Sequence, residues 1–92
     1  MKYRYVVAEP FWKIFYNLLP SQKESTRETW KIFKENPFDP RLRTHKIHSL
    51  SSKLKRTIYA VEIEKNLRAI FYVEGDLVVT LDIGTHDVYK GQ

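Results

Sequence analysis

The chain has 92 residues, of which 42% are hydrophobic and 14% aromatic; this is enough apolar material for one folded core and argues against intrinsic disorder. It contains no cysteine, which excludes disulfides and thiolate metal sites. The 16 Lys and Arg residues outnumber the 11 Asp and Glu residues and give a net charge of +5, which suits an anionic partner such as a nucleic acid.

We expect a single domain over residues 1–92, because no repeat, low-complexity tract or linker divides the sequence. No apolar stretch approaches the roughly 18 residues of a membrane span. Residues 1–7 lack the apolar core and the small-residue cleavage site of a signal peptide. We therefore expect a cytoplasmic protein with no membrane partner.

The N-terminal part predicts a strand followed by a helix. Residues 3–7 are aromatic or β-branched at most positions, which is typical of a strand. Glu9-Pro10 opens a helix, because proline is favoured in a first helical turn. Pro20 is expected to end that helix. The apolar stripe at helical spacing comprises Phe11, Ile14, Phe15 and Leu18, and we expect Trp12 in the core as well.

A second helix is predicted from a capping-box pattern, in which Ser21 is followed by Glu24. Its inward face should comprise Thr26, Trp30 and Phe33. Asn36-Pro37 should end the pair of antiparallel helices, because the residue before proline disfavours helical geometry.

Residues 37–53 contain two prolines and three serines and predict an extended loop. Three strands follow over residues 57–63, 67–73 and 77–83, each with alternating side-chain character. Short connections at residues 65–66 and 74–76 predict an antiparallel meander. The predicted fold is α+β with element order β-α-α-β-β-β, in which a helical hairpin packs on one face of a small, mostly antiparallel sheet.

Arg68 should lie on the sheet face that the helices leave open. Leu67, Ala69 and Phe71 alternate with Arg68 and Ile70. Because an unpaired arginine is costly to bury, the face of Leu67, Ala69 and Phe71 is the better candidate for the core. Arg68 is then expected near the basic loop.

The net positive charge is concentrated in one segment. Residues 41–56 hold six Lys or Arg residues, two of the three histidines and no acidic residue. These basic residues and histidines are Arg41, Arg43, His45, Lys46, His48, Lys53, Lys55 and Arg56. Such a segment attracts polyanions, and its imidazoles can also transfer protons. Two histidines without a nearby carboxylate are a poor metal pair, so we expect no metal.

If this segment is extended, His45 and Ile47 project to one side, whereas Lys46 and His48 project to the other. Only one of the two histidines is then expected to reach a site directly.

Four segments, taken in order, resemble motifs of one toxin superfamily. Residues 36–40 (NPFDP) are similar to an Asn-Pro element, and residues 45–50 (HKIHSL) to a basic stretch that ends in leucine. Residues 68–72 (RAIFY) resemble an Arg-apolar-apolar-Tyr strand with one extra apolar residue, and residues 83–89 (IGTHDVY) a Gly-x-His/Arg…Tyr ending. The chain therefore resembles the RelE/ParE superfamily of toxin–antitoxin systems, particularly its RelE-like and YafQ-like branches.

The resemblance implies a metal-independent endoribonuclease without a cofactor, which enters the ribosomal A site and cuts mRNA. The ribose 2′-OH would attack the adjacent phosphate and give a 2′,3′-cyclic phosphate and a 5′-OH. The expected partners are mRNA, the ribosome with its rRNA, and a cognate antitoxin. DNA contact is expected only through the antitoxin.

The resemblance also implies roles for individual residues. Arg68 would clamp the scissile phosphate, His86 would act as general acid or base, and Tyr89 would stack on a base or orient the 2′-OH. His48 and Lys46 occupy the catalytic loop positions of the family. The RNA-binding set comprises Arg41, Arg43, His45, Lys53, Lys55 and Arg56.

Each of these residues has a simpler structural alternative. Arg68 could pair across the hairpin with Glu62 or Glu64. His86 could be a surface histidine, and Tyr89 a C-terminal anchor against the sheet. The sequence leaves open which residue is the base and which is the acid.

Two other functions remain open from the sequence. A ParE-like toxin would inhibit DNA gyrase without catalysis, although such members generally lack the basic cluster and the terminal His and Tyr. An inactive relative would bind RNA or protein only.

Overall fold

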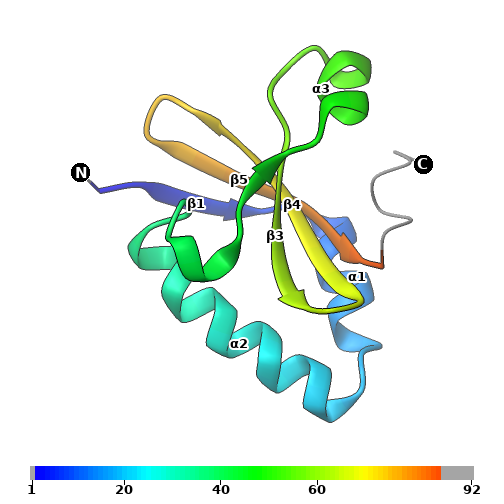
Figure 1. Cartoon of the computed structure of the whole chain (residues 1–92). Coiled ribbons are helices and arrows are strands. Elements are labelled where there is room, and N and C mark those ends of the chain that lie inside the picture. Colours follow the sequence, from blue (N-terminus) through cyan, green and yellow to red (C-terminus); the bar gives the residue numbers. More distant parts are fainter. Residues whose placement is uncertain (1, 86–92) are drawn as a thin grey trace.

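The computed structural model describes residues 2–85 and consists of one mixed sheet with helices on both faces (Figure 1). The strands lie in the order β1-β5-β4-β3-β2. The elements in chain order are β1 (Arg4–Val7), α1 (Glu9–Tyr16), α2 (Pro20–Glu35), the 3₁₀ turn η1 (Pro40–Leu42), β2 (His45–Lys46), α3 (His48–Leu54), β3 (Tyr59–Glu64), β4 (Leu67–Glu74) and β5 (Leu77–Gly84).

The predicted α+β class and the antiparallel meander are confirmed. β3, β4 and β5 pair antiparallel through the two-residue connections 65–66 and 75–76. Gly75 has a φ of +64°, which suits glycine at the first position of a tight hairpin turn. β1 pairs parallel to β5, with Val6 opposite Val79, so the N-terminal strand extends the edge that the meander leaves open.

The main core lies between the sheet and the two long helices. Phe71 of β4 is 1% exposed, and the centre of its ring lies 4.9 Å from the centre of the Phe33 ring on α2. Val61, Ala69 and Val78 contribute to the same cluster from the three meander strands. On β4 these are the positions that the sequence assigned to the core, on the face opposite Arg68.

The helix boundaries differ from those predicted. α1 ends at Tyr16 rather than at Pro20, because the Asn17 side chain donates a hydrogen bond to the Lys13 carbonyl (2.9 Å). Pro20 instead begins α2, in the first-turn position that proline favours. The predicted cap at Ser21 and Glu24 is wrong, because Gln22 Oε1 accepts the hydrogen bond of the Leu19 amide (2.9 Å).

Two residues predicted for the core are exposed. Trp12 is 40% exposed and Ile14 is 42% exposed, whereas Phe11 and Phe15 of the same helix are buried. α1 has only eight residues, so a narrow stripe at i and i+4 is enough to cover its part of the sheet.

The loop predicted for residues 37–53 contains η1, β2 and α3. α3 packs on the face of the sheet opposite α1 and α2, where Leu50 joins Ile58, Ala60 and Ile70 in a second buried cluster. Ser51 Oγ accepts a hydrogen bond from the Ile58 amide (2.8 Å) and so ties α3 to the start of β3. No helix among residues 2–85 is both long and apolar enough to cross a membrane.

Candidate functional site

The β2–α3 segment forms a basic hollow of about 310 Å³ on the surface. It is lined by Lys46, His48, Ser51, Ser52, Arg56 and Thr57. The lining residues carry two basic side chains, one imidazole and three hydroxyl groups, and we call this space the basic hollow. Cationic side chains and hydroxyl groups are the kinds that can bind an oxyanion, and an imidazole is the kind that can transfer a proton.

The alternation predicted for the loop positions holds for residues 45–47, whereas His48 already begins α3. The Cα atoms of His45 and Lys46 lie opposite Ala60 and Tyr59 of β3, so their side chains project to opposite faces of the sheet. Ile47 is buried in the second cluster on the Ala60 side. Lys46 and His48, on either side of Ile47, both line the basic hollow.

Arg56 reaches the hollow because β4 holds it there. Its guanidinium lies 4.2 Å from the centre of the Tyr72 ring, and its Nη1 lies 3.6 Å from Glu74 Oε2. Nothing in the sequence marks Tyr72 and Glu74 as supports for this arginine. No local pattern could have identified them, because they are two strands away along the chain.

Arg68 lies on the sheet face opposite Leu67, Ala69 and Phe71, as predicted, but that face is not open, because α3 packs on it. Arg68 does not line the basic hollow. Its side chain is 12% exposed, and Nη1 donates to the Glu64 carbonyl oxygen (2.8 Å) and lies 3.5 Å from Glu62 Oε2. The cross-strand ion pair left open by the sequence is therefore present. Tyr72, which contacts the Arg56 guanidinium, lies four positions further along β4, or about 13 Å of strand.

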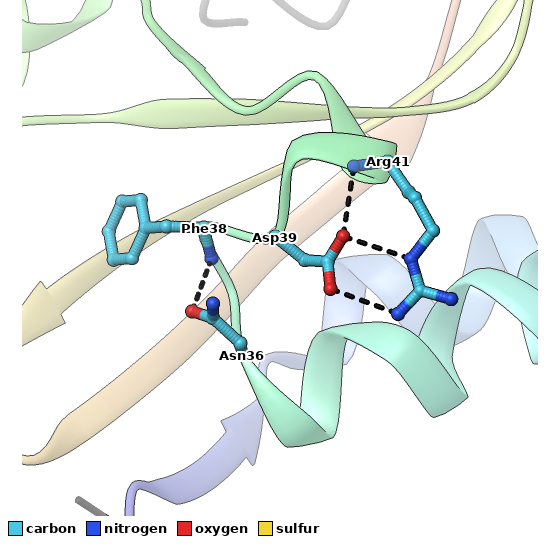
Figure 2. A network of polar contacts seen from close by, with 4 residues as sticks. All are labelled: Asn36, Phe38, Asp39 and Arg41. Carbon is cyan, nitrogen blue, oxygen red and sulfur yellow. Dashed lines mark hydrogen bonds and ion pairs between the residues drawn. The ribbon is translucent and has the colours of Figure 1, made fainter.

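Arg41 is engaged by a carboxylate just outside the acid-free segment (Figure 2). Asp39 accepts hydrogen bonds from the Arg41 amide and Nε through Oδ1 (2.9 and 3.0 Å) and from Nη2 through Oδ2 (2.9 Å). These hydrogen bonds from Arg41 lower the pKa of Asp39 to about 2. Arg41 therefore contributes less free positive charge to the surface than its place in the basic segment suggests.

Replacing Asp39 by Asn should remove part of the acid sensitivity of folding. The carboxylate is ionised in the folded protein down to about pH 2 but protonates near pH 4 when unfolded. Its stabilising effect is therefore complete above about pH 4 and is lost as the pH falls toward 2. Urea unfolding at pH 7, 4, 3 and 2 measures the free energy of unfolding, which should fall less with decreasing pH in Asp39→Asn than in the wild type. If the free energy of unfolding falls with pH equally in Glu28→Asn and Asp39→Asn, Asp39 is not the source of this acid sensitivity.

Four other predicted RNA-binding residues lie on the surface but do not line the basic hollow. Arg43, His45, Lys53 and Lys55 are all exposed. Arg43 and Lys55 adopt left-handed backbone conformations (φ 51° and 56°), which turn the chain after η1 and after α3. His45 Nδ1 lies 2.9 Å from the Arg43 carbonyl oxygen, on the other side of β2 from Lys46.

His86 and Tyr89 lie outside the described residues. The strand that leads to them is described, and Gly84 at its end is the register partner of Arg68. Within residues 2–85, no group of three or more His, Asp or Glu side chains is placed to hold a metal ion.

No protein-family model matches the sequence, and no curated protein matches it significantly. Solved structures do match the fold. Archaeal RelE in the RelE–RelB complex of Pyrococcus horikoshii OT3 has a TM-score of 0.71 at 15% identity, over 92% of this chain and 96% of that one. YafQ from E. coli BL21(DE3) has a TM-score of 0.72 at 14% identity, over 98% of this chain and 100% of that one.

A third match is the YoeB/ParE toxin from Agrobacterium tumefaciens, with a TM-score of 0.66 at 14% identity, over 94% of this chain and 99% of that one. At these identities the likeness concerns the fold. The chain has the RelE/ParE-like toxin fold over nearly its whole length, as its sequence motifs predicted.

Proposed function

We propose that this protein is the toxin of a type II toxin–antitoxin system and acts as a ribosome-dependent mRNA endoribonuclease. The observation that supports this most directly is the basic hollow, where Lys46, His48 and Arg56 converge on a fold shared with RelE, YafQ and YoeB/ParE toxins. The hollow has the groups needed to bind a phosphodiester and to move a proton next to it.

In this proposal the phosphate lies in the basic hollow, where Lys46 and Arg56 offset the negative charge that builds up on phosphorus. Arg56 is already positioned by Tyr72 and Glu74, so little reorganisation is needed when RNA binds. Ser51 and Ser52 add neutral donors. The attacking group is the ribose 2′-OH, which restricts the reaction to RNA.

The proton transfers are assigned to histidines. His48 would serve one of the two steps, and His86 after β5 would serve the other, with Tyr89 orienting or stacking the RNA. Arg68 does not line the basic hollow, and it would contact the bound RNA from the neighbouring part of the sheet, at the expense of its contact with Glu62. Arg41, Arg43, His45, Lys53 and Lys55 would hold flanking phosphates or rRNA without reading sequence.

The proposed partners are mRNA, the ribosome and a cognate antitoxin. One of the structures with the same fold is a RelE–RelB complex, and a small acidic inhibitor would complement the net charge of +5. The proposed location is the cytoplasm, where translating ribosomes are found.

The proposed activity can be tested with purified protein in a reconstituted translation reaction. Primer extension should show cuts in mRNA at the ribosomal A site, and mass spectrometry of the fragments should show a 2′,3′-cyclic phosphate. Omitting ribosomes should abolish cleavage. If mRNA stays intact while gyrase supercoiling is inhibited, the chain is a ParE-like toxin instead. If both activities are absent at saturating protein, the enzymatic proposal is wrong.

A further inference from the structure

The Arg56 side chain lies on an aromatic ring at the edge of the basic hollow. Its guanidinium carbon is 4.2 Å from the centre of the Tyr72 ring, which is close enough for the guanidinium and the ring to be in contact. Tyr72 is itself half-buried and packs against the second cluster under α3. The ring therefore gives the guanidinium a fixed support.

Backbone contacts hold the same arginine from the other end. The Arg56 amide donates a hydrogen bond to the Ser51 carbonyl oxygen (3.2 Å), and the Ile58 amide donates one to Ser51 Oγ (2.8 Å). Arginine has a large side-chain entropy, and ordering it on binding normally weakens affinity. Because Arg56 is already restrained at its backbone and at its guanidinium, a ligand that contacts it loses little of its binding energy to this ordering.

One face of the guanidinium remains for a ligand. A guanidinium is planar, so its N–H groups point outward in the plane and leave two flat faces. Tyr72 covers one face, yet the Arg56 side chain is 43% exposed and lines the basic hollow. The exposed area therefore belongs to the edge and to the second face. Guanidinium planes and aromatic rings are the surfaces on which unpaired RNA bases stack.

The basic hollow has room for more than a phosphate group. Its volume of about 310 Å³ corresponds to about ten water molecules at their volume in the liquid, and a phosphate group is much smaller than that. Lys46, His48 and Ser51 supply the cation, the imidazole and a hydroxyl group for a phosphate, whereas Arg56 also presents a flat surface. A base that adjoins the bound phosphate can therefore enter the same space.

A carboxylate beside this flat surface favours one kind of base. Glu74 Oε2 lies 3.6 Å from Arg56 Nη1, and the Glu74 side chain is 70% exposed. A carboxylate repels a phosphate at this end of the hollow, but it accepts hydrogen bonds from an amino group. Glutamate pairs in this way with the amino group of cytosine. Uracil has a carbonyl oxygen at the same position, which a carboxylate disfavours.

We propose that the stacked pair of Arg56 and Tyr72 holds the nucleobase next to the bound phosphate, and that Glu74 selects a base with an amino group, so that cytosine is preferred over uracil. Arg56 can serve the phosphate as well, because its N–H groups lie in the plane and the base uses the face. The proposal rests on the proposed function in that the bound polyanion is RNA.

Binding of single nucleotides tests the proposal without ribosomes and without cleavage. NMR titration of the full chain at pH 7 compares cytidine 3′-phosphate, uridine 3′-phosphate and inorganic phosphate. Cytidine 3′-phosphate should bind at least about fivefold more tightly than inorganic phosphate, because its base stacks on Arg56. It should also bind about fivefold more tightly than uridine 3′-phosphate. Glu74→Gln should reduce this second preference to about twofold or less, because glutamine also offers an N–H group to uracil.

Arg56→Lys keeps the positive charge but removes the flat face. The preference for cytidine 3′-phosphate over inorganic phosphate should fall to about twofold or less. Arg27→Lys is the matched control, because Arg27 also lies over an aromatic ring (5.8 Å from the centre of the Phe15 ring) and beside a glutamate (3.7 Å from Glu24). Arg27 is on α2 and does not line the basic hollow, so its replacement should leave all three affinities within about twofold.

The base site is overturned if cytidine 3′-phosphate binds no more tightly than inorganic phosphate, or if Arg56→Lys and Arg27→Lys change its affinity equally. The role of Glu74 is overturned if the wild type binds cytidine and uridine 3′-phosphates alike, or if Glu74→Gln keeps the full preference. These results are independent of the nuclease assay. Intact mRNA together with the expected nucleotide preferences would contradict the nuclease proposal alone, whereas cleaved mRNA without these preferences would contradict the base site alone.

Discussion

Replacing His48 by Ala is expected to lower mRNA cleavage by about 10²- to 10⁴-fold, the range that one general acid or base supplies. Lys46 and Arg56 remain in the hollow, so the loss should fall on kcat rather than on KM. His48 is exposed at the start of α3, and its truncation leaves no cavity. Single-turnover cleavage on programmed ribosomes measures the effect, and thermal unfolding should show an unchanged midpoint.

His45→Ala is the matched control for this prediction. The two histidines are three residues apart in the same basic segment, but His45 projects from the other side of β2 and contacts the Arg43 carbonyl. We expect its replacement to change affinity for the ribosome slightly and the rate of the bound complex not at all. Equal losses of rate in the two variants would contradict the assignment of proton transfer to His48.

Replacing Arg68 by Ala is expected to reduce cleavage by about 10²- to 10³-fold, as for loss of one preorganised donor to a developing oxyanion. Stability should fall as well, because the Glu62 carboxylate and the Glu64 carbonyl both lose a partner. Removing a hydrogen bond to a charged group typically costs about 1.5–3 kcal/mol. Urea unfolding and single-turnover cleavage, measured on the same samples, give the two effects separately.

Glu62→Gln distinguishes a catalytic Arg68 from a structural one. Glutamine keeps the size of the side chain but removes the negative charge 3.5 Å from Arg68 Nη1. If Arg68 serves the phosphate, Glu62→Gln should leave cleavage unchanged or increase it, because the guanidinium keeps its full charge for the substrate. If Glu62→Gln and Arg68→Ala lose stability alike and both folded proteins cleave normally, Arg68 is a structural residue.

Sequence periodicity predicted the meander and its buried face correctly. The strands alternate with a period of two, so the positions of Leu67, Ala69 and Phe71 fixed that face without knowledge of the rest of the fold. Burial of these residues at 7% exposure or less confirms it. Helix ends were predicted less well, because Pro20 is compatible with ending one helix and with beginning the next.

The candidate site was only partly predictable. Local spacing placed Lys46 and His48 together, since they flank the inward-facing Ile47. The partners of the arginines were not predictable in the same way. Arg56 rests on Tyr72, sixteen residues away in sequence, and Arg41 pairs with an aspartate that lies outside the acid-free segment.

The sequence by itself determined the fold class, the hairpins, the concentration of positive charge and the face that carries Arg68, because each follows from local alternation or from composition. The tertiary structure decided the parallel pairing of β1 with β5, the existence of α3 and the composition of the basic hollow. α3 has only seven residues, three of them serine, and its own helical preference is weak. It forms where burial of Leu50 against Ile58 and Ile70 stabilises it, and that burial exists only once β3 and β4 have paired.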